Sequence, residues 1–391
     1  MILGAFAVVV VASLFIVFSS DDSEASTGTC GEGVTYTLEG DTLTISYESG
    51  TGRMDDFNKA PWFDDRNEIK TVVVGEGVTY IGVSSFSSCV NLTSVTLPST
   101  LESIGNGAFY RCQNLKTVTI PDNVSSIGMS AFAFCMVLEE INIPDGITEI
   151  PKRMCFHCTG LKEVELPASV RVIGHEAFVY CTALTKVTLN EGLEVIGYSA
   201  FNTCEFLEEI TLPETLTTIG EKAFDFCTSL KSIVIPQSVT ELGASAFDSC
   251  ISLETIILSD NITVLKSKTF YYCRSLTFLN MPTELKTIET LAFAGCENLT
   301  AIHFYYDLET VEENAFRDHV FYSETGGKIS PTADNLAGYP FSGEDCRHMI
   351  KDTSPQGDDD QEGMRNNVNV AFYCFLGLIV AIPVLVLIRR F

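Results

Sequence analysis

The sequence predicts an elongated, β-rich solenoid of repeats, and three columns of residues at a fixed spacing of 23 predict it. The first column is aromatic and continues for eleven periods, or 253 residues, without insertion or deletion. A cysteine stands three residues after each aromatic position, and a leucine stands three residues after the cysteine. The aromatic column contains Phe63, Phe86, Phe109, Phe132, Cys155, Phe178, Phe201, Phe224, Phe247, Phe270, Phe293 and Phe316.

Most repeats carry the same local sequence signals in the same order. After the leucine comes an apolar alternation such as Val118 and Ile120, which is typical of a strand with one buried face. A proline such as Pro121 closes that strand because it has no N–H to donate. A second apolar pair follows, and then a glycine such as Gly128, expected to turn the corner because glycine accepts positive φ. The Ala-Phe-x-x-Cys segment is expected to form one short turn of helix. Stacked repeats would then form a parallel sheet.

These residues resemble the BspA-like leucine-rich repeat, whose pattern is L-x-x-V-x-I-P-x-x-V-x-x-I-G-x-x-A-F-x-x-C. The match covers Trp62 to about Arg317, and we expect about 11 coils of this α/β repeat. The resemblance implies a cell-surface or secreted protein, commonly an adhesin, without naming a ligand. Lys266, Glu289 and Glu312 depart from it by replacing the corner glycine, so the late coils are expected to turn differently.

The flanking segments suggest caps and membrane-related ends. Residues 26–61 contain two apolar alternations on either side of Glu39-Gly40-Asp41, which predict a β-hairpin that caps the first coil. Trp62, the only tryptophan, is expected to cover that coil. The solenoid is assigned to 62–318, a C-terminal β-rich cap to 319–351 and a disordered acidic linker to 352–367.

Both ends of the chain are apolar. Residues 1–25 predict a secretory signal peptide, with an uncleaved N-terminal anchor as the alternative because no Lys or Arg precedes the apolar run. Residues 368–388 carry no charge and are long enough to cross a membrane as a helix. Arg389 and Arg390 then place residues 389–391 in the cytoplasm and the repeats outside the cell.

Composition and motifs disfavour several classes of function. A net charge of −27 repels phosphate backbones, so nucleic acid is not an expected partner. No histidine stands in a nucleophile motif, and no glycine-rich phosphate loop is present. We therefore expect no enzyme, no cofactor and no metal site.

The fourteen cysteines suggest disulfides if the chain is exported, but the column favours another reading. In-register cysteines point the same way and each is equidistant from two neighbours, so we expect a ladder of buried free thiols. Cys155 and Cys158 form a C-x-x-C, which alone could be a redox pair or half a metal site. Both residues already fill repeat positions, which favours a structural role.

Two sets of surface residues are candidate sites. From Thr96 to His303 the outward position at the middle of the strand is polar except at Val234 and Ile257, and Phe278 takes another outward position on the next coil. These three form a candidate partner-contact patch, unless a cap or loop covers them. Asn91, Asn123, Asn261 and Asn298 each begin an N-x-S/T triplet and are candidate glycosylation sites.

A further pattern lies two residues after the aromatic column, where Phe134, Tyr180, Phe226 and Tyr272 recur every 46 residues. His157, Thr203 and Ser249 take the same position on the intervening coils. Packing of large rings over small neighbours explains the pattern, and a row of aromatic ligand contacts is the alternative.

The sequence therefore predicts a membrane-anchored ectodomain that mediates adhesion or recognises an extracellular protein or glycan. The alternative is a structural envelope or spacer protein without a specific ligand.

Overall fold

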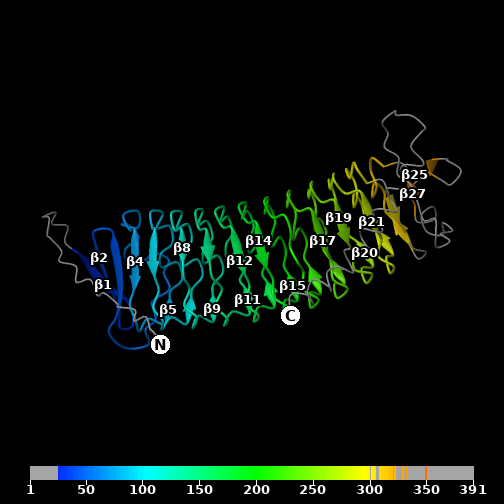
Figure 1. The fold of residues 1–391 in the computed structure, drawn as a ribbon. Helices are drawn as coiled ribbons and strands as arrows, with labels where there is room; N and C mark the ends of the chain where they lie inside the picture. The colour runs from blue at the N-terminus through cyan, green and yellow to red at the C-terminus, as the bar shows by residue number, and fades with distance from the viewer. Residues whose placement is uncertain are drawn as a thin grey trace, which may run out of the picture. The chain divides into compact units, whose positions relative to one another are not determined.

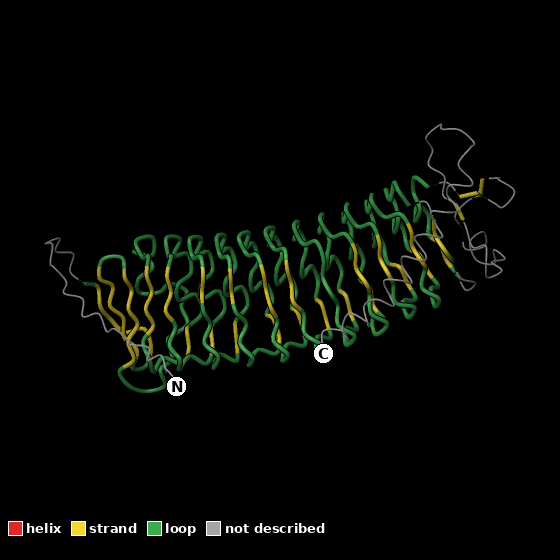
Figure 2. Tube along the Cα trace, viewed as in Figure 1, coloured by secondary structure: helices red, strands yellow, loops and turns green. Residues whose placement is uncertain are grey.

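The computed structural model describes residues 25–299, 301–304, 308–319, 321–322, 328–329, 332 and 348–349. Over this part of the chain it is a β-solenoid of about ten turns with no helix. Successive 23-residue coils lie side by side (Figure 1). Each coil contributes short strands joined by turns (Figure 2). The predicted 368–388 helix lies outside the described residues, and no described helix is long and apolar enough to span a membrane. The segments 1–24 and 352–367 also lie outside them.

Two series of strands follow one another along the stack. The first series is β4 (Thr71–Val74), β6 (Ser94–Thr96), β8 (Thr117–Val118), β10 (Glu140–Ile141), β12 (Glu163–Glu165), β14 (Lys186–Thr188), β17 (Ser232–Val234), β19 (Thr255–Ile257), β21 (Phe278–Asn280) and β23 (Ala301–His303). The second is β5 (Tyr80–Ile81), β7 (Ser103–Ile104), β9 (Ser126–Ile127), β11 (Glu149–Ile150), β13 (Val172–Ile173), β15 (Val195–Ile196), β16 (Thr218–Ile219), β18 (Glu241–Leu242), β20 (Val264–Leu265), β22 (Thr287–Ile288) and β24 (Thr310–Val311). Paired strands in both series are parallel and, as in Val164 opposite Val187, shifted by one period of 23.

The predicted N-terminal hairpin is confirmed. Strand β2 (Val34–Glu39) pairs antiparallel with β3 (Thr42–Tyr47), β1 (Ser26–Gly31) pairs with β2, and β3 joins β4 in parallel. At the other end, β27 (His348–Met349) pairs antiparallel with β23, and β25 (Phe321–Tyr322) with β26 (Lys328–Ile329). Most of 319–351 lies outside the described residues, so the C-terminal cap stays a prediction, as does a capping role for the hairpin.

The core is formed by the predicted columns. The column phenylalanines from Phe86 to Phe316 are buried, as are the cysteine and leucine columns. Neighbouring rings stack at centroid distances such as 5.3 Å between Phe109 and Phe132. Stacked coils therefore bury side chains that one coil alone would expose.

The prediction that Phe63 is the first member of the aromatic column is wrong. Trp62 takes that position: its ring is buried and stacks on Phe86 at 5.8 Å, and its Nε1 donates to the Ser85 carbonyl at 2.9 Å. Phe63 is only half-buried, and the cations of Lys59 and Arg66 lie 5.5 Å and 4.0 Å from its ring centre. Trp62 thus begins the ring stack as expected, and the regular column starts one coil later than predicted.

The Ala-Phe-x-x-Cys segment is not a helical turn. The residues two before and two after the column adopt positive φ, as at Ser84 (55°) and Ser88 (64°). The N–H groups of Ser84, Phe86 and Ser88 donate to Asn106, Ala108 and Tyr110 of the next coil at 2.6–3.0 Å. A helical turn would keep these donors within its own coil. The segment instead forms a third ladder between coils.

The corner glycines are needed for space rather than for positive φ. None of the glycines from Gly82 to Gly243 at this position has a left-handed backbone. A Cβ at Gly220 would lie 2.7 Å from the carbonyl carbon of Gly197 on the preceding coil, closer than carbon atoms pack. Glu289 and Glu312 keep the backbone hydrogen bond of this corner, donating to Leu265 and Ile288 at 2.9 Å. The expectation that the late coils turn differently is therefore wrong for this hydrogen bond at Glu289 and Glu312.

Candidate partner-contact surface

The candidate patch lies on the first strand series. Strands β17 and β19 are paired so that Val234 lies directly opposite Ile257. Val234 is 50% exposed and Ile257 is half-buried. Phe278 pairs with Thr255 rather than with Ile257, so it lies two positions earlier along β21 than a direct neighbour would. The structure thus brings two of the three residues into register and sets the third diagonally.

The outward residues from Thr96 to Thr211 are polar, as predicted, whereas half-buried Val73 at the same position on β4 is apolar. The outward residues on the preceding coils are exposed: Thr96, Thr119, Asn142, Glu165, Thr188 and Thr211. The apolar pair interrupts a polar surface, which is the pattern expected of a local contact site.

The four candidate glycosylation asparagines are exposed, and three of them also have a structural role. The side-chain amides of Asn91, Asn123 and Asn261 each donate to a backbone carbonyl of the preceding coil at 2.7 Å. These bonds account for asparagine at those positions, and glycosylation stays a prediction.

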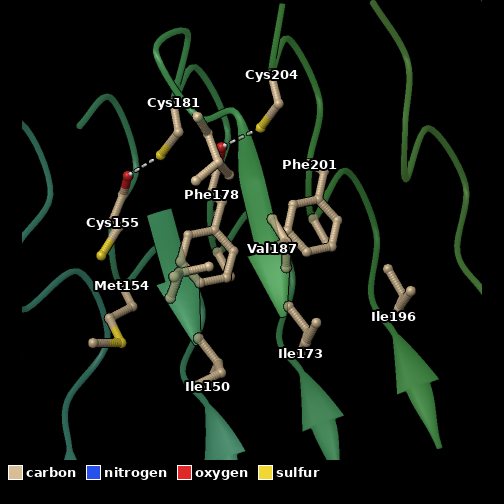
Figure 3. Packing of buried hydrophobic residues seen from close by; sticks show 14 of the residues in the cluster. Ile150, Met154, Cys155, Ile173, Phe178, Cys181, Val187, Ile196, Phe201 and Cys204 are labelled. Atoms are coloured by element: carbon tan, nitrogen blue, oxygen red, sulfur yellow. Dashed lines mark hydrogen bonds between the residues drawn. The ribbon is translucent and has the colours of Figure 1, made fainter. Parts of the chain in front are cut away.

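The cysteine column is a ladder of free, buried thiols, as expected. Each Sγ from Cys112 to Cys296 donates to the carbonyl of the column residue one coil back, as Cys204 does to Phe178 at 3.3 Å (Figure 3). Burial raises the pKa of the Cys89 thiol to about 12 and holds the pKa of the Cys112 thiol well above its ordinary value. These thiols pack and cap carbonyl groups instead of acting as nucleophiles.

The C-x-x-C fits the same structural role. Cys155 and Cys158 are fully buried, and Cys155 accepts the Cys181 thiol at its carbonyl (Figure 3). A hydrogen bond with Cys158, together with burial, raises the pKa of Cys155. Buried Met154 occupies the position that is alanine on most coils, so it supplies volume beside the missing phenylalanine ring. Among the described residues, no group of three or more His, Cys, Asp or Glu could hold a metal ion.

Sequence reasoning missed a polar row one residue after the column. Asn202, Asp225 and Asp248 take this position on successive coils, and Asp225 is only 7% exposed. Asn202 Nδ2 donates to Asp225 Oδ2 at 2.9 Å, whereas the buried Asp225 Oδ1 has no partner. Burial, then the charge of Asp248, raises the pKa of Asp225 to about 7. The signal in the sequence was two acids at a position that is otherwise mostly apolar.

The aromatic row proves to be partly stacked and partly open. The imidazole of His157 stacks between Phe134 at 5.0 Å and Tyr180 at 4.3 Å. Farther along, Tyr180, Phe226 and Tyr272 remain 41%, 49% and 37% exposed. Packing explains the first part of the row, and the second part leaves large rings in solvent.

Comparison with known proteins agrees with the repeat. A family model described as the BspA type leucine rich repeat region matches residues 60–185, 152–277 and 195–323. A leucine-rich repeat protein from Bacteroides ovatus is 23% identical, with a TM-score of 0.59, over 78% of this chain and 92% of that one. This likeness supports the fold.

Two further structures are similar at lower TM-scores. A leucine-rich repeat protein from Eubacterium ventriosum is 25% identical (TM-score 0.49; 75% of this chain, 95% of that one). A leucine rich cell surface protein from Faecalibacterium prausnitzii is 26% identical (TM-score 0.45; 77% and 93%). No curated protein matches the chain. Because the family model covers most of the chain, the protein belongs to the BspA type leucine-rich repeat family.

Proposed function

We propose that this protein is anchored at a cell surface and there recognises an extracellular protein or glycan, with adhesion as the outcome. The observation that carries the proposal is the in-register pair of Val234 and Ile257 on a strand face that is polar over the six preceding coils. Exposed apolar side chains on a charged, soluble surface cost free energy unless a partner buries them. Membership of the BspA type family and the apolar ends of the sequence support the surface location.

The test is a binding assay with the full-length chain. We expect saturable binding to at least one immobilised matrix protein, glycan or cell type. The double variant V234K/I257K should weaken that binding at least about tenfold, as loss of an interface centre does. The matched control T188K/T211K adds the same charges to the same face on neighbouring coils, and it should bind like the wild type.

Two results would contradict the proposal. Equal weakening by both variants would show that added charge, not loss of the patch, reduces binding. Absence of binding by a wild-type protein with a cooperative unfolding transition would favour the spacer role instead.

A further inference from the structure

The aromatic row on the turn after the column offers a binding site distinct from the strand patch. Its members lie at the same position on successive coils. The Phe226 N–H donates to the Asp248 carbonyl at 2.9 Å, and the Ser249 N–H donates to the Tyr271 carbonyl at 2.7 Å. Phe226, Ser249 and Tyr272 are therefore consecutive members of the row, and we call the space over Ser249 between the two rings the Ser249 gap.

The protein itself shows what fills such a gap. Phe134 and Tyr180 are also two coils apart, and His157 places a planar ring between them. The interplanar angles are only 10° and 17°, so the three groups stack face to face. Two coil spacings are about 9.6 Å, which leaves room for one planar group with a ring on each side. In the Ser249 gap a hydroxymethyl group replaces the imidazole.

The Ser249 gap is open to solvent. Ser249 is half-buried, whereas Thr203, at the equivalent position between Tyr180 and Phe226, is only 8% exposed. Within the described residues, the Phe226 ring contacts no other aromatic ring or cation. The gap therefore lies between two exposed rings, and the Tyr272 ring also makes a T-shaped contact with Tyr271 at 4.4 Å.

The floor of the gap is acidic. Ser249 Oγ donates to Asp248 Oδ1 at 2.9 Å, which holds that carboxyl next to the gap. Asp225, one coil back, has an unpartnered and buried Oδ1. Lys222 lies 4.0 Å from Glu221, Lys268 lies over the Tyr271 ring, and the charges of both lysines also act on Asp225 and Asp248. A cation from a partner would meet the Asp248 carboxyl, which forms no ion pair among the described residues.

Guanidinium groups already stack on rings of this same turn. Arg111 lies 5.4 Å from the Phe134 ring centre, and Arg274 lies 5.2 Å from that of Tyr272. Arg274 also pairs with Glu297 on the following coil at 3.3 Å, so it lies on the side of Tyr272 away from the gap. A planar cation that stacks on aromatic faces and binds carboxylates is the chemistry of arginine, not of lysine.

We propose that the Ser249 gap binds the guanidinium group of an arginine side chain from a basic protein partner, stacked between Phe226 and Tyr272 and paired with the Asp248 carboxylate. The net charge of −27 would draw such a partner towards the protein. The gap lies on a different segment of the coil from Val234 and Ile257, so failure of this proposal leaves the proposed function unaffected.

The experiment compares hexa-arginine with hexa-lysine as probes for the full-length chain at physiological salt. The two peptides carry equal charge, so a difference reports stacking and bidentate pairing. We expect hexa-arginine to bind roughly tenfold more tightly. The variant S249H should remove that difference because it fills the gap as His157 fills its own, without removing a core residue. The control F206S removes an exposed ring of a neighbouring coil outside the row and should keep the difference.

Equal affinities of the two peptides for the wild type would overturn the proposal, as would an arginine preference that survives in S249H. A neutral oligosaccharide panel forms the last arm. Saturable sugar binding that S249H abolishes, without an arginine preference, would assign the gap to a sugar ring and overturn the arginine assignment.

Discussion

Residue types in this solenoid recur at the same position of successive coils, so the most informative residues are those that differ from the others at their position. Asp225 is the clearest case, because a buried carboxyl with an unpartnered oxygen replaces the mostly apolar residues found at this position. Burial favours the neutral acid, and the neighbouring Asp248 charge adds to that preference. The coil therefore holds a carboxyl that is neutral in mild acid and ionised above neutral pH.

This predicts how stability depends on pH. The folded-state pKa of Asp225 is about 7, above the ordinary value of 3.8. Its contribution to stability is therefore fully present below about pH 4 and is lost as the pH rises through 7. The variant D225N cannot ionise, and its amide oxygen can still accept from Asn202. We expect D225N to be more stable than the wild type at pH 8 by at least about 1 kcal/mol and to gain much less at pH 5.

Urea unfolding at both pH values measures this difference. The charged and titratable groups around Asp225 are Asp248, Lys222, Lys268 and the thiols of Cys227 and Cys250, all of which D225N retains. An equal effect of D225N at pH 5 and pH 8 would mean that Asp225 does not titrate between them.

At the scale of the element, the sequence predicted the columns, the strands and the N-terminal hairpin because each depends on periodic burial. It did not predict the backbone between the corner and the cysteine. Positive φ occurs there at residues such as Arg153 and Lys222, which have no intrinsic preference for the left-handed region. Those residues are held left-handed by hydrogen bonds to the next coil, which a single repeat does not contain.

The same limit applies to the surface. The sequence could indicate that Val234 and Ile257 are apolar on a polar face, because alternation along a strand decides which way they point. It could not show that His157 stacks between two rings while Ser249 leaves a gap, because that depends on three coils in register. The offset of Phe278 from Ile257 likewise depends on strand pairing.

Glycine can be needed in the coil either because no Cβ fits or because φ is positive, and Gly220 and Gly107 are examples of the two cases. Gly220 has an ordinary φ but no space for a Cβ, whereas Gly107 has φ of 59° and only ordinary contacts, the nearest at 3.6 Å. Other coils carry serine, lysine or glutamate where Gly107 stands. We expect G220A to destabilise the protein by about 2 kcal/mol or more through the backbone clash, and G107S to change stability by less than about 1 kcal/mol.

Thermal and urea unfolding of the two variants compares them directly. If G107S proved as damaging as G220A, space would not be the factor that distinguishes the two positions.

At the scale of the whole molecule, each coil contacts chiefly its two neighbours, so stability should be close to a sum of coil and interface contributions. Deleting residues 183–205 removes one period and joins Thr182 to Phe206, the residue equivalent to Ala183. Every column then continues across the junction, and Phe178 meets Phe224 as its new neighbour. We expect a cooperatively folded protein that loses β14 and β15 but keeps the same fraction of residues in strands, with a Tm lowered by about 2–4 °C for each kcal/mol lost. Deleting residues 183–193 instead joins unlike positions and should abolish cooperative unfolding. Circular dichroism during heating distinguishes the two, and equal loss of structure in both deletions would show that the stack does not tolerate removal of a complete coil.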